Sequence, residues 1–187
     1  MAADYKAPCL DTSVFLGGVN EEIRDGIKRH VVFNYIWDRA KEGKFRILTF
    51  AITIAEVFKK KKPIHATPET PMLDEFLNMM EEDFVDIIEV DREIGFEAHR
   101  LCRLYAPQKL MPNDGIHLAC ALRAKCDVLL AWDRPLVSVP HPNIKIDNPK
   151  ILNRTLFSEA ELATPLEIAA YEAAERLREQ SLGKFRK

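Results

Sequence analysis

The sequence lacks an excess of either charge, and it lacks a long uncharged run. Its 187 residues include 27 Lys or Arg and 29 Asp or Glu, which gives a formal net charge of −2 with histidine neutral. A strongly basic domain would indicate a general nucleic-acid surface, and this near-neutral chain gives no such indication. The longest stretch without Asp, Glu, Lys or Arg covers residues 135–144, whereas a membrane-spanning helix needs about 20 apolar residues. We therefore expect no membrane contact.

The beginning of the sequence lacks the apolar segment of a secretion signal, because Asp4, Lys6 and Asp11 interrupt any apolar run. The cysteines lack CxxC spacing and lie mostly in apolar segments: Cys9, Cys102, Cys120 and Cys126. Such cysteines are typical of buried thiols in a reducing compartment. We expect no disulfide framework and a cytoplasmic protein.

What the sequence does contain is an alternation of strand and helix patterns, in a composition typical of globular domains with 47% apolar residues. Short apolar runs predict strands at 8–16, ending near Asp11, and at 45–50, 84–90, 127–132 and 143–147. Helical spacing predicts helices at 20–43, with a break near Gly26 as an alternative, and at 51–62, 68–82, 92–105 and 113–125. This rhythm predicts a three-layer α/β/α fold with a mainly parallel central sheet of about five strands. In such folds, functional sites lie beyond the carboxyl ends of the strands.

The length favours one domain with an appendage over two full domains. We expect the main domain at residues 1–150 and a C-terminal helical extension at 151–187. Thr164 and Glu167 form a capping box, and the residues that follow make one apolar helical stripe: Leu166, Ala170, Ala173 and Leu177. The stripe either packs on the domain or binds a second protein, and the sequence leaves both open.

Four carboxylates fall where this fold places its functional edge. Asp11 ends the first strand, and Asp133 follows the strand DVLLAW. Glu56 lies on the helix after the second strand, and Asp114 lies in the first turn of another helix. Each has an ordinary alternative explanation, which is a helix cap or a turn for the aspartates and an i,i+4 pair with a lysine for Glu56.

Taken together, the four acids require a cation. Helical spacing places Glu56 on the rim of an apolar face and Asp114 on the same face as His117, so neither points into open solvent. The helix N-terminus stabilises an anion at Asp114 by roughly 0.3–1 kcal/mol, which does not offset crowding by three further carboxylates. Oxygen ligands with few imidazoles select Mg²⁺ or Mn²⁺ over zinc. Two such ions activate water and stabilise the leaving oxygen of a phosphodiester, which is the chemistry of a nuclease.

Residues 8–147 resemble a PIN domain, the ribonuclease fold of VapC-type toxins in toxin–antitoxin pairs. Four segments carry the resemblance: CLDTSVFL with Asp11, LTFAITIAEV with Glu56, MPNDGIHLACAL with Asp114 and DVLLAWDRPL with Asp133. The resemblance implies that these four acids gather Mg²⁺ or Mn²⁺ and hydrolyse an RNA phosphodiester bond. It also implies that Thr12 and Ser13 help to orient the metal or the phosphate.

The resemblance further implies a small antitoxin protein as a partner and a homodimer. For RNA binding, we expect the basic run Lys59, Lys60, Lys61 and Lys62 and also Arg134 to contact phosphates. The alternative for the lysine run is a solvated helix end. The chain is long for a VapC-type toxin, and Ala131 occupies a position where the family usually has Thr.

Three alternatives compete with a metal-dependent nuclease. A zinc site could form from the i,i+3 pairs His99 with Cys102 and His117 with Cys120. A haloacid-dehalogenase-type phosphatase would need an aspartate where Ser13 stands, which disfavours that class. The third is a PIN-like RNA-binding or scaffold protein with weakened catalysis. Ala131 favours it, and the retention of four mutually repelling acids opposes it.

Overall fold

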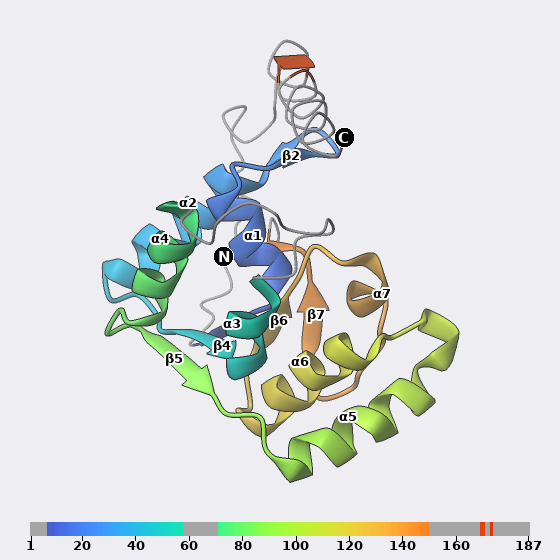
Figure 1. Cartoon of the computed structure of the whole chain (residues 1–187). Coiled ribbons are helices and arrows are strands. Elements are labelled where there is room, and N and C mark those ends of the chain that lie inside the picture. The colour runs from blue at the N-terminus through green and yellow to red at the C-terminus, as the bar shows by residue number, and fades with distance from the viewer. Residues whose placement is uncertain (1–6, 58–70, 150–168, 171–172, 174–187) are drawn as a thin grey trace, which may run out of the picture.

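The computed structural model describes residues 7–57, 71–149, 169–170 and 173 (Figure 1). Its centre is one all-parallel sheet of five strands in the order β5-β4-β1-β6-β7. In that order the strands are Val85–Ile88, Ile47–Phe50, Pro8–Leu10, Val128–Leu130 and Lys145–Asp147. Helices cover both faces of the sheet, which confirms the predicted α/β/α class.

The helices fall into two groups, one on each face of the sheet (Figure 1). One face carries α1 (Thr12–Val19), α2 (Arg29–Lys41) and α4 (Pro71–Met80). The other face carries α5 (Arg92–Leu104), a 3₁₀ helix (Ala106–Gln108), α6 (Pro112–Arg123) and α7 (Arg134–Val137). Among the helices of the described ranges, none is both long and apolar enough to cross a membrane.

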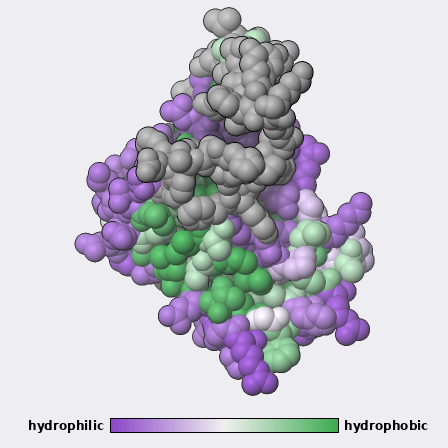
Figure 2. All heavy atoms as spheres, in the orientation of Figure 1, coloured by the Kyte–Doolittle hydropathy of each residue, from purple (hydrophilic) through white to green (hydrophobic). Residues whose placement is uncertain are grey.

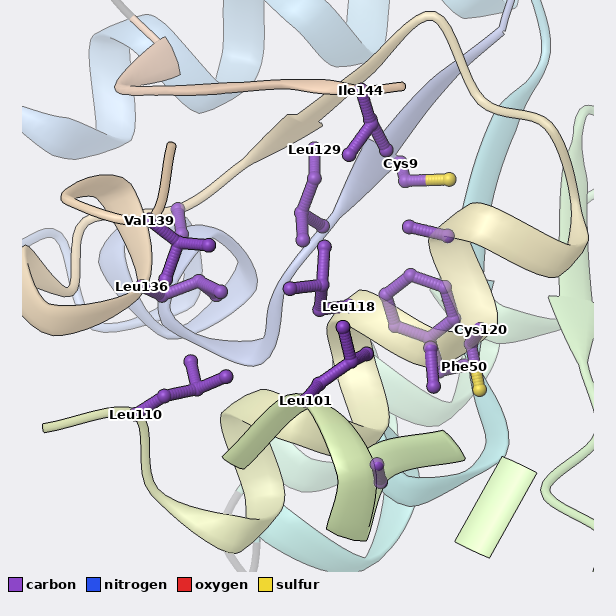
Figure 3. Close-up of a cluster of buried hydrophobic side chains, with 14 of the residues drawn as sticks. Cys9, Phe50, Leu101, Leu110, Leu118, Cys120, Leu129, Leu136, Val139 and Ile144 are labelled. Carbon is purple, nitrogen blue, oxygen red and sulfur yellow. The ribbon is translucent and has the colours of Figure 1, made fainter. Parts of the chain in front are cut away.

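Each face has its own apolar core. Under α1, α2 and α4, the rings of Phe33 and Phe76 contact Phe15 with centroid distances of 5.7 and 5.8 Å. On the other face, Leu101 and Leu118 pack against the sheet, as Figure 3 shows. Burying each of these side chains stabilises the fold by about 1.5–3 kcal/mol. The sheet therefore packs against helices on both of its faces.

Helix α3 (Ala51–Val57) follows β4 directly and lies at this edge of the sheet. Its Ile52 packs against the core under α5 and α6, and its Ile54 and Val57 pack against the core under α1 and α2. Figure 2 shows hydrophobic side chains gathered around α3 within a mostly hydrophilic face. The contacts of α3 with both cores fix the position of Glu56, which lies near its end.

The segment after β1 differs from the prediction. The sequence predicts a helix from residue 20, but α1 already begins at Thr12, and a small hairpin of β2 (Ile23–Arg24) and β3 (Ile27–Lys28) separates it from α2. Gly17 and Gly18 lie inside α1. A Cβ at Gly18 would collide with the Phe33 ring, so glycine inside α1 allows close packing of α2.

The cysteines also differ from the prediction in part. Cys9 and Cys126 form a disulfide with a Cα–Cα distance of 6.1 Å, whereas Cys102 and Cys120 are free. The pairing follows from the sheet, because Cys9 lies on β1 and Cys126 just precedes β6, its hydrogen-bonded neighbour. The expectation of four free thiols is therefore wrong for this pair.

Several predicted segments extend beyond the described residues. The helix predicted at 51–62 is described only to Val57, and Lys59, Lys60, Lys61 and Lys62 lie outside. Of the extension predicted at 151–187, only residues 169, 170 and 173 are described, and they are helical. The domain boundary at residue 150 stays a prediction.

Candidate active site

The first two acids follow neighbouring strands. Asp11 follows β1 and caps α1, where its Oδ2 accepts a hydrogen bond of 2.9 Å from the Ser13 amide. Asp133 follows β6 at the N-terminus of α7, and its side chain makes no capping bond there. The helices that leave β1 and β6 lie on opposite faces, so both acids lie at the point where the topology of the sheet switches. Ligand sites of open parallel sheets form at such points.

Asp114 lies in the first turn of α6, and its surroundings oppose its ionisation. Burial and the nearby carboxylates of Asp133 and Asp11 raise its pKa to about 7. Burial and Asp11 also raise the pKa of Asp133, although a hydrogen bond with the Asp114 side chain acts in the opposite direction. At neutral pH Asp114 is therefore only about half ionised. These three acids form an anionic cluster that is short of positive charge.

Glu56 reaches the same place from α3, but other groups stabilise its charge. His117 Nε2 lies 2.8 Å from Glu56 Oε2, Thr12 Oγ1 donates to that oxygen over 2.6 Å, and the Asn113 amide donates to Oε1. Burial alone would raise the pKa of Glu56, but the bonds from His117 and Thr12 outweigh it and lower the pKa to about 2. Glu56 therefore stays ionised at any physiological pH.

His117 connects Glu56 to the aspartates. Its ring is 1% exposed, and its Nε2 also lies 3.3 Å from Asp11 Oδ1. Burial would lower the pKa of His117, but the charge of Asp11 and the hydrogen bond to Glu56 outweigh it and raise the pKa. An edge-on contact with Phe50, at 5.1 Å between centroids, holds the ring in place. The site thus contains a buried imidazole that contacts two of its four acids.

The two predicted supporting hydroxyls have separate contacts. Thr12 orients Glu56, as described above, while Ser13 Oγ accepts a 2.9 Å bond from the Trp132 amide. Ser13 therefore ties the start of α1 to the segment that carries Asp133. Ala131, in place of the usual Thr, is fully buried, and its amide donates to the Asp147 carbonyl over 3.1 Å.

Sequence reasoning missed the contributions of Asn113 and His117 to this site. The available signal was their i,i+4 spacing, which places both on the face of α6 that begins beside Asp114. The zinc alternative is not supported, because His117 Nε2 faces Asp11 and Glu56 rather than a cysteine. The thiol of Cys102 instead donates to the Met111 carbonyl.

The donor chemistry suits a hard divalent cation, although the ligands are not yet arranged around one. In the part of the chain that the structure describes, no three His, Cys, Asp or Glu side chains form a group that could hold a metal. Glu56 Oε2 already contacts His117 Nε2 and the Thr12 hydroxyl. Deprotonation of Asp114 would free carboxylate oxygens of the type that Mg²⁺ and Mn²⁺ prefer.

Comparison with known proteins finds one matching family model and several solved structures with a similar fold. A model of the PIN domain matches residues 9–141. The fold is similar to VapBC2 from Rickettsia felis, solved bound to a DNA fragment from their promoter, with a TM-score of 0.52 and 18% identity over 76% of this chain and 98% of that chain. It is also similar to VapC20 from Mycobacterium tuberculosis, a Sarcin-Ricin loop cleaving toxin, with a TM-score of 0.53 and 12% identity over 74% of this chain and 98% of that chain. Among curated proteins, none matches the chain.

Proposed function

The chain belongs to the PIN-domain family, and on that basis we propose that it is a ribonuclease that hydrolyses RNA phosphodiester bonds with Mg²⁺ or Mn²⁺. The observation that carries the proposal is the convergence of Asp11, Asp114 and Asp133 at one edge of the sheet, where burial and the two neighbouring aspartates raise the pKa of Asp114 to about 7. Such crowding destabilises the site unless a cation joins it. Strongly perturbed carboxylates at a sheet switch point are characteristic of catalytic sites.

In this proposal Asp11, Asp114 and Asp133 hold the ion. When bound, the ion supplies water activation and neutralises the negative charge that develops on the phosphate. Glu56 has a pKa of about 2 and is a weak base. It therefore contributes fixed negative charge and orientation rather than proton transfer. His117 keeps Glu56 ionised and in place through their 2.8 Å contact.

The test is RNA cleavage with Mn²⁺, with EDTA, and by the Asp11→Asn variant. Each of the last two conditions should reduce cleavage by at least about 100-fold, because charge stabilisation of the phosphate is lost. Asp38→Asn is the matched control, since Asp38 is an exposed aspartate on α2. Cleavage that is indifferent to EDTA and to Asp11→Asn would exclude a metal-dependent nuclease.

We further propose that the protein is the toxin of a toxin–antitoxin pair, inhibited by a small protein, and that it forms a homodimer. The support is the fold shared with VapBC2 and VapC20. Expression of this chain alone should arrest growth, and co-expression of a small protein encoded beside it should restore growth. Growth that is unaffected by an active, soluble nuclease would contradict the toxin role.

Ala131 favours a second candidate, which is a PIN-like RNA-binding or scaffold protein with weakened catalysis. The buried methyl group cannot supply the hydroxyl that the resemblance leads us to expect at this position. The same assay separates the candidates. RNA binding without cleavage in Mn²⁺ would favour the scaffold, whereas turnover that EDTA abolishes would favour the nuclease.

A further inference from the structure

A pocket of about 440 Å³ opens beside the acid cluster. Its lining residues include Ser13 and Asp133, which belong to the candidate active site, and three arginines: Arg24, Arg29 and Arg134. The pocket is therefore continuous with the candidate active site, but arginines outnumber acids among its lining residues. Arg134 is the residue after Asp133, and Arg24 comes from the β2–β3 hairpin.

Arg29 is a buried residue in the wall of the pocket. Its side chain is only 7% exposed, and its guanidinium lies 4.6 Å from the centroid of the Trp132 ring. Its Nη1 contacts Glu22 Oε2 at 2.8 Å. Arg29 Nε and Trp132 Nε1 are both buried without a hydrogen-bond partner, and both residues line the pocket. Buried donors without acceptors cost about 1–3 kcal/mol each, so the wall of the pocket around Arg29 is short of hydrogen-bond acceptors.

Arg24 and Arg134 are exposed, whereas Arg29 is buried. The Arg24 side chain is 63% exposed, and its Nη1 lies 3.9 Å from Glu22 Oε1. Glu22 is already bonded to Arg29, so it neutralises Arg24 only in part. The pocket also contains Asp25 and Asp133 as lining acids. An ion on Asp133 would leave the three arginines as the dominant charge.

We propose that this pocket binds the RNA backbone phosphate next to the bond that is cleaved, with Arg24 and Arg134 at its mouth and Arg29 deeper inside. The inference rests on the proposed nuclease function. A strand whose scissile phosphate lies at the acid cluster carries its next phosphate one nucleotide away, and the pocket adjoins that cluster through Ser13 and Asp133. The planar guanidinium fork suits two phosphate oxygens at once. The arginines thus position the strand and do not touch the reacting atoms.

The test measures binding of a short fluorescent single-stranded RNA to the full chain carrying Asp114→Asn, so that binding is read without cleavage. Arg24→Gln and Arg134→Gln are added to this parent singly. Arg39→Gln is the matched control, because Arg39 is an exposed arginine paired with Glu42 at 3.5 Å on α2. Arg29 is not substituted, since it is buried and its removal would also disturb the fold.

Each pocket variant should raise the Kd for RNA by roughly tenfold, as expected for the loss of a charged hydrogen bond. Each should also reduce the slope of log K against log salt by about one, the signature of one lost phosphate contact. The control should change neither quantity. Unchanged affinity in both pocket variants, an equal loss in the control, or no RNA binding by the parent would overturn the inference.

Cleavage kinetics separate this inference from the proposed function. In an otherwise native chain that cleaves RNA, the pocket variants should raise KM by roughly tenfold and leave kcat unchanged, because a positioning contact is lost uniformly. A native chain that does not cleave RNA, together with reduced RNA affinity in the variants, would reject the nuclease and support the pocket. Normal KM in both variants of an active enzyme would reject the pocket and support the nuclease.

Discussion

At the scale of single residues, Asp114 and Glu56 show how neighbours decide the charge of a carboxylate. Both are partly buried, and burial raises the pKa of both. Asp114 faces two further acids, so its pKa rises to about 7, whereas hydrogen bonds from His117 and Thr12 lower that of Glu56 to about 2. The neighbours of Asp114 therefore oppose its negative charge, whereas the neighbours of Glu56 stabilise it.

The raised pKa of Asp114 predicts a pH-dependent cost to the metal-free fold. Between its ordinary value of 3.8 and about 7, the folded state binds more protons than the unfolded state, so stability falls as pH rises through this window. Asp114→Asn removes that cost. In EDTA at pH 8 the variant should be more stable than the native protein by about 1–2 kcal/mol, after a discount for solvent screening.

Urea unfolding at pH 4 and pH 8 checks this prediction. The advantage of Asp114→Asn should shrink toward pH 4, where the native carboxyl is protonated in the folded state. A variant that is less stable than the native protein at pH 8 would contradict the electrostatic account of the cluster.

His117 gives a second prediction at this scale. His117→Gln removes the imidazole that contacts Glu56 Oε2 and Asp11 Oδ1, so two carboxylates lose a shared partner and the protein should lose about 3 kcal/mol of stability. His99→Gln is the control, because His99 is an exposed histidine on the neighbouring helix α5. Equal unfolding midpoints of the two variants in urea would show that His117 is an ordinary core residue.

The sequence predicted that the four acids lie at one edge of the sheet, but it did not predict the contacts that this histidine makes with them. Order along the chain and helical spacing place Asp11, Glu56, Asp114 and Asp133 at one edge, and the structure places them there. An imidazole on an apolar helix face has the same pattern whether it packs in a core or contacts an acid. The contact between His117 and Glu56 depends on how α3 packs against α6, which the sequence pattern does not specify.

At the scale of elements, hydrophobic periodicity predicted the strands and most helices, because it depends on which face of an element is buried. It failed between residues 12 and 28, where glycine has two different roles. Gly17 and Gly18 serve close packing inside α1 rather than a turn. The available signal for the hairpin was Asp25-Gly26, whose φ angles of +53° and +73° suit the tight turn that this dipeptide favours.

The packing role of Gly18 predicts an unusual effect of alanine. Gly18→Ala should destabilise the protein by about 1–3 kcal/mol, because the new Cβ overlaps Phe33, even though alanine is the better helix former. Gly95→Ala is the matched control within α5, since nothing lies within 4 Å of its Cβ position. That control should gain about 0.5–1 kcal/mol. Thermal unfolding of both variants checks the prediction, and destabilisation of both by the same amount would contradict it.

At the scale of the whole molecule, the position of the acid cluster depends on the order of the strands in the sheet. Strand β6 enters beside β1 from the opposite face, and this places Asp133 and Arg134 next to Asp11 although they are far apart in sequence. The sequence predicted the parallel sheet and hence this edge. It could not predict that the hairpin would bring Arg24 to the same pocket, because that contact depends on how α1 and α2 pack.

The most direct test of the account is calorimetric titration of Mn²⁺ into the protein at pH 7 in buffers of different ionisation enthalpy. Binding requires Asp114 to lose its proton, so the native chain should release about half a proton per ion at this pH. Asp114→Asn should release none, Asp11→Asn should bind much more weakly, and Asp38→Asn should behave as the native protein. Absence of Mn²⁺ binding, or binding that Asp11→Asn leaves unchanged, would contradict the claim that these acids form one metal site.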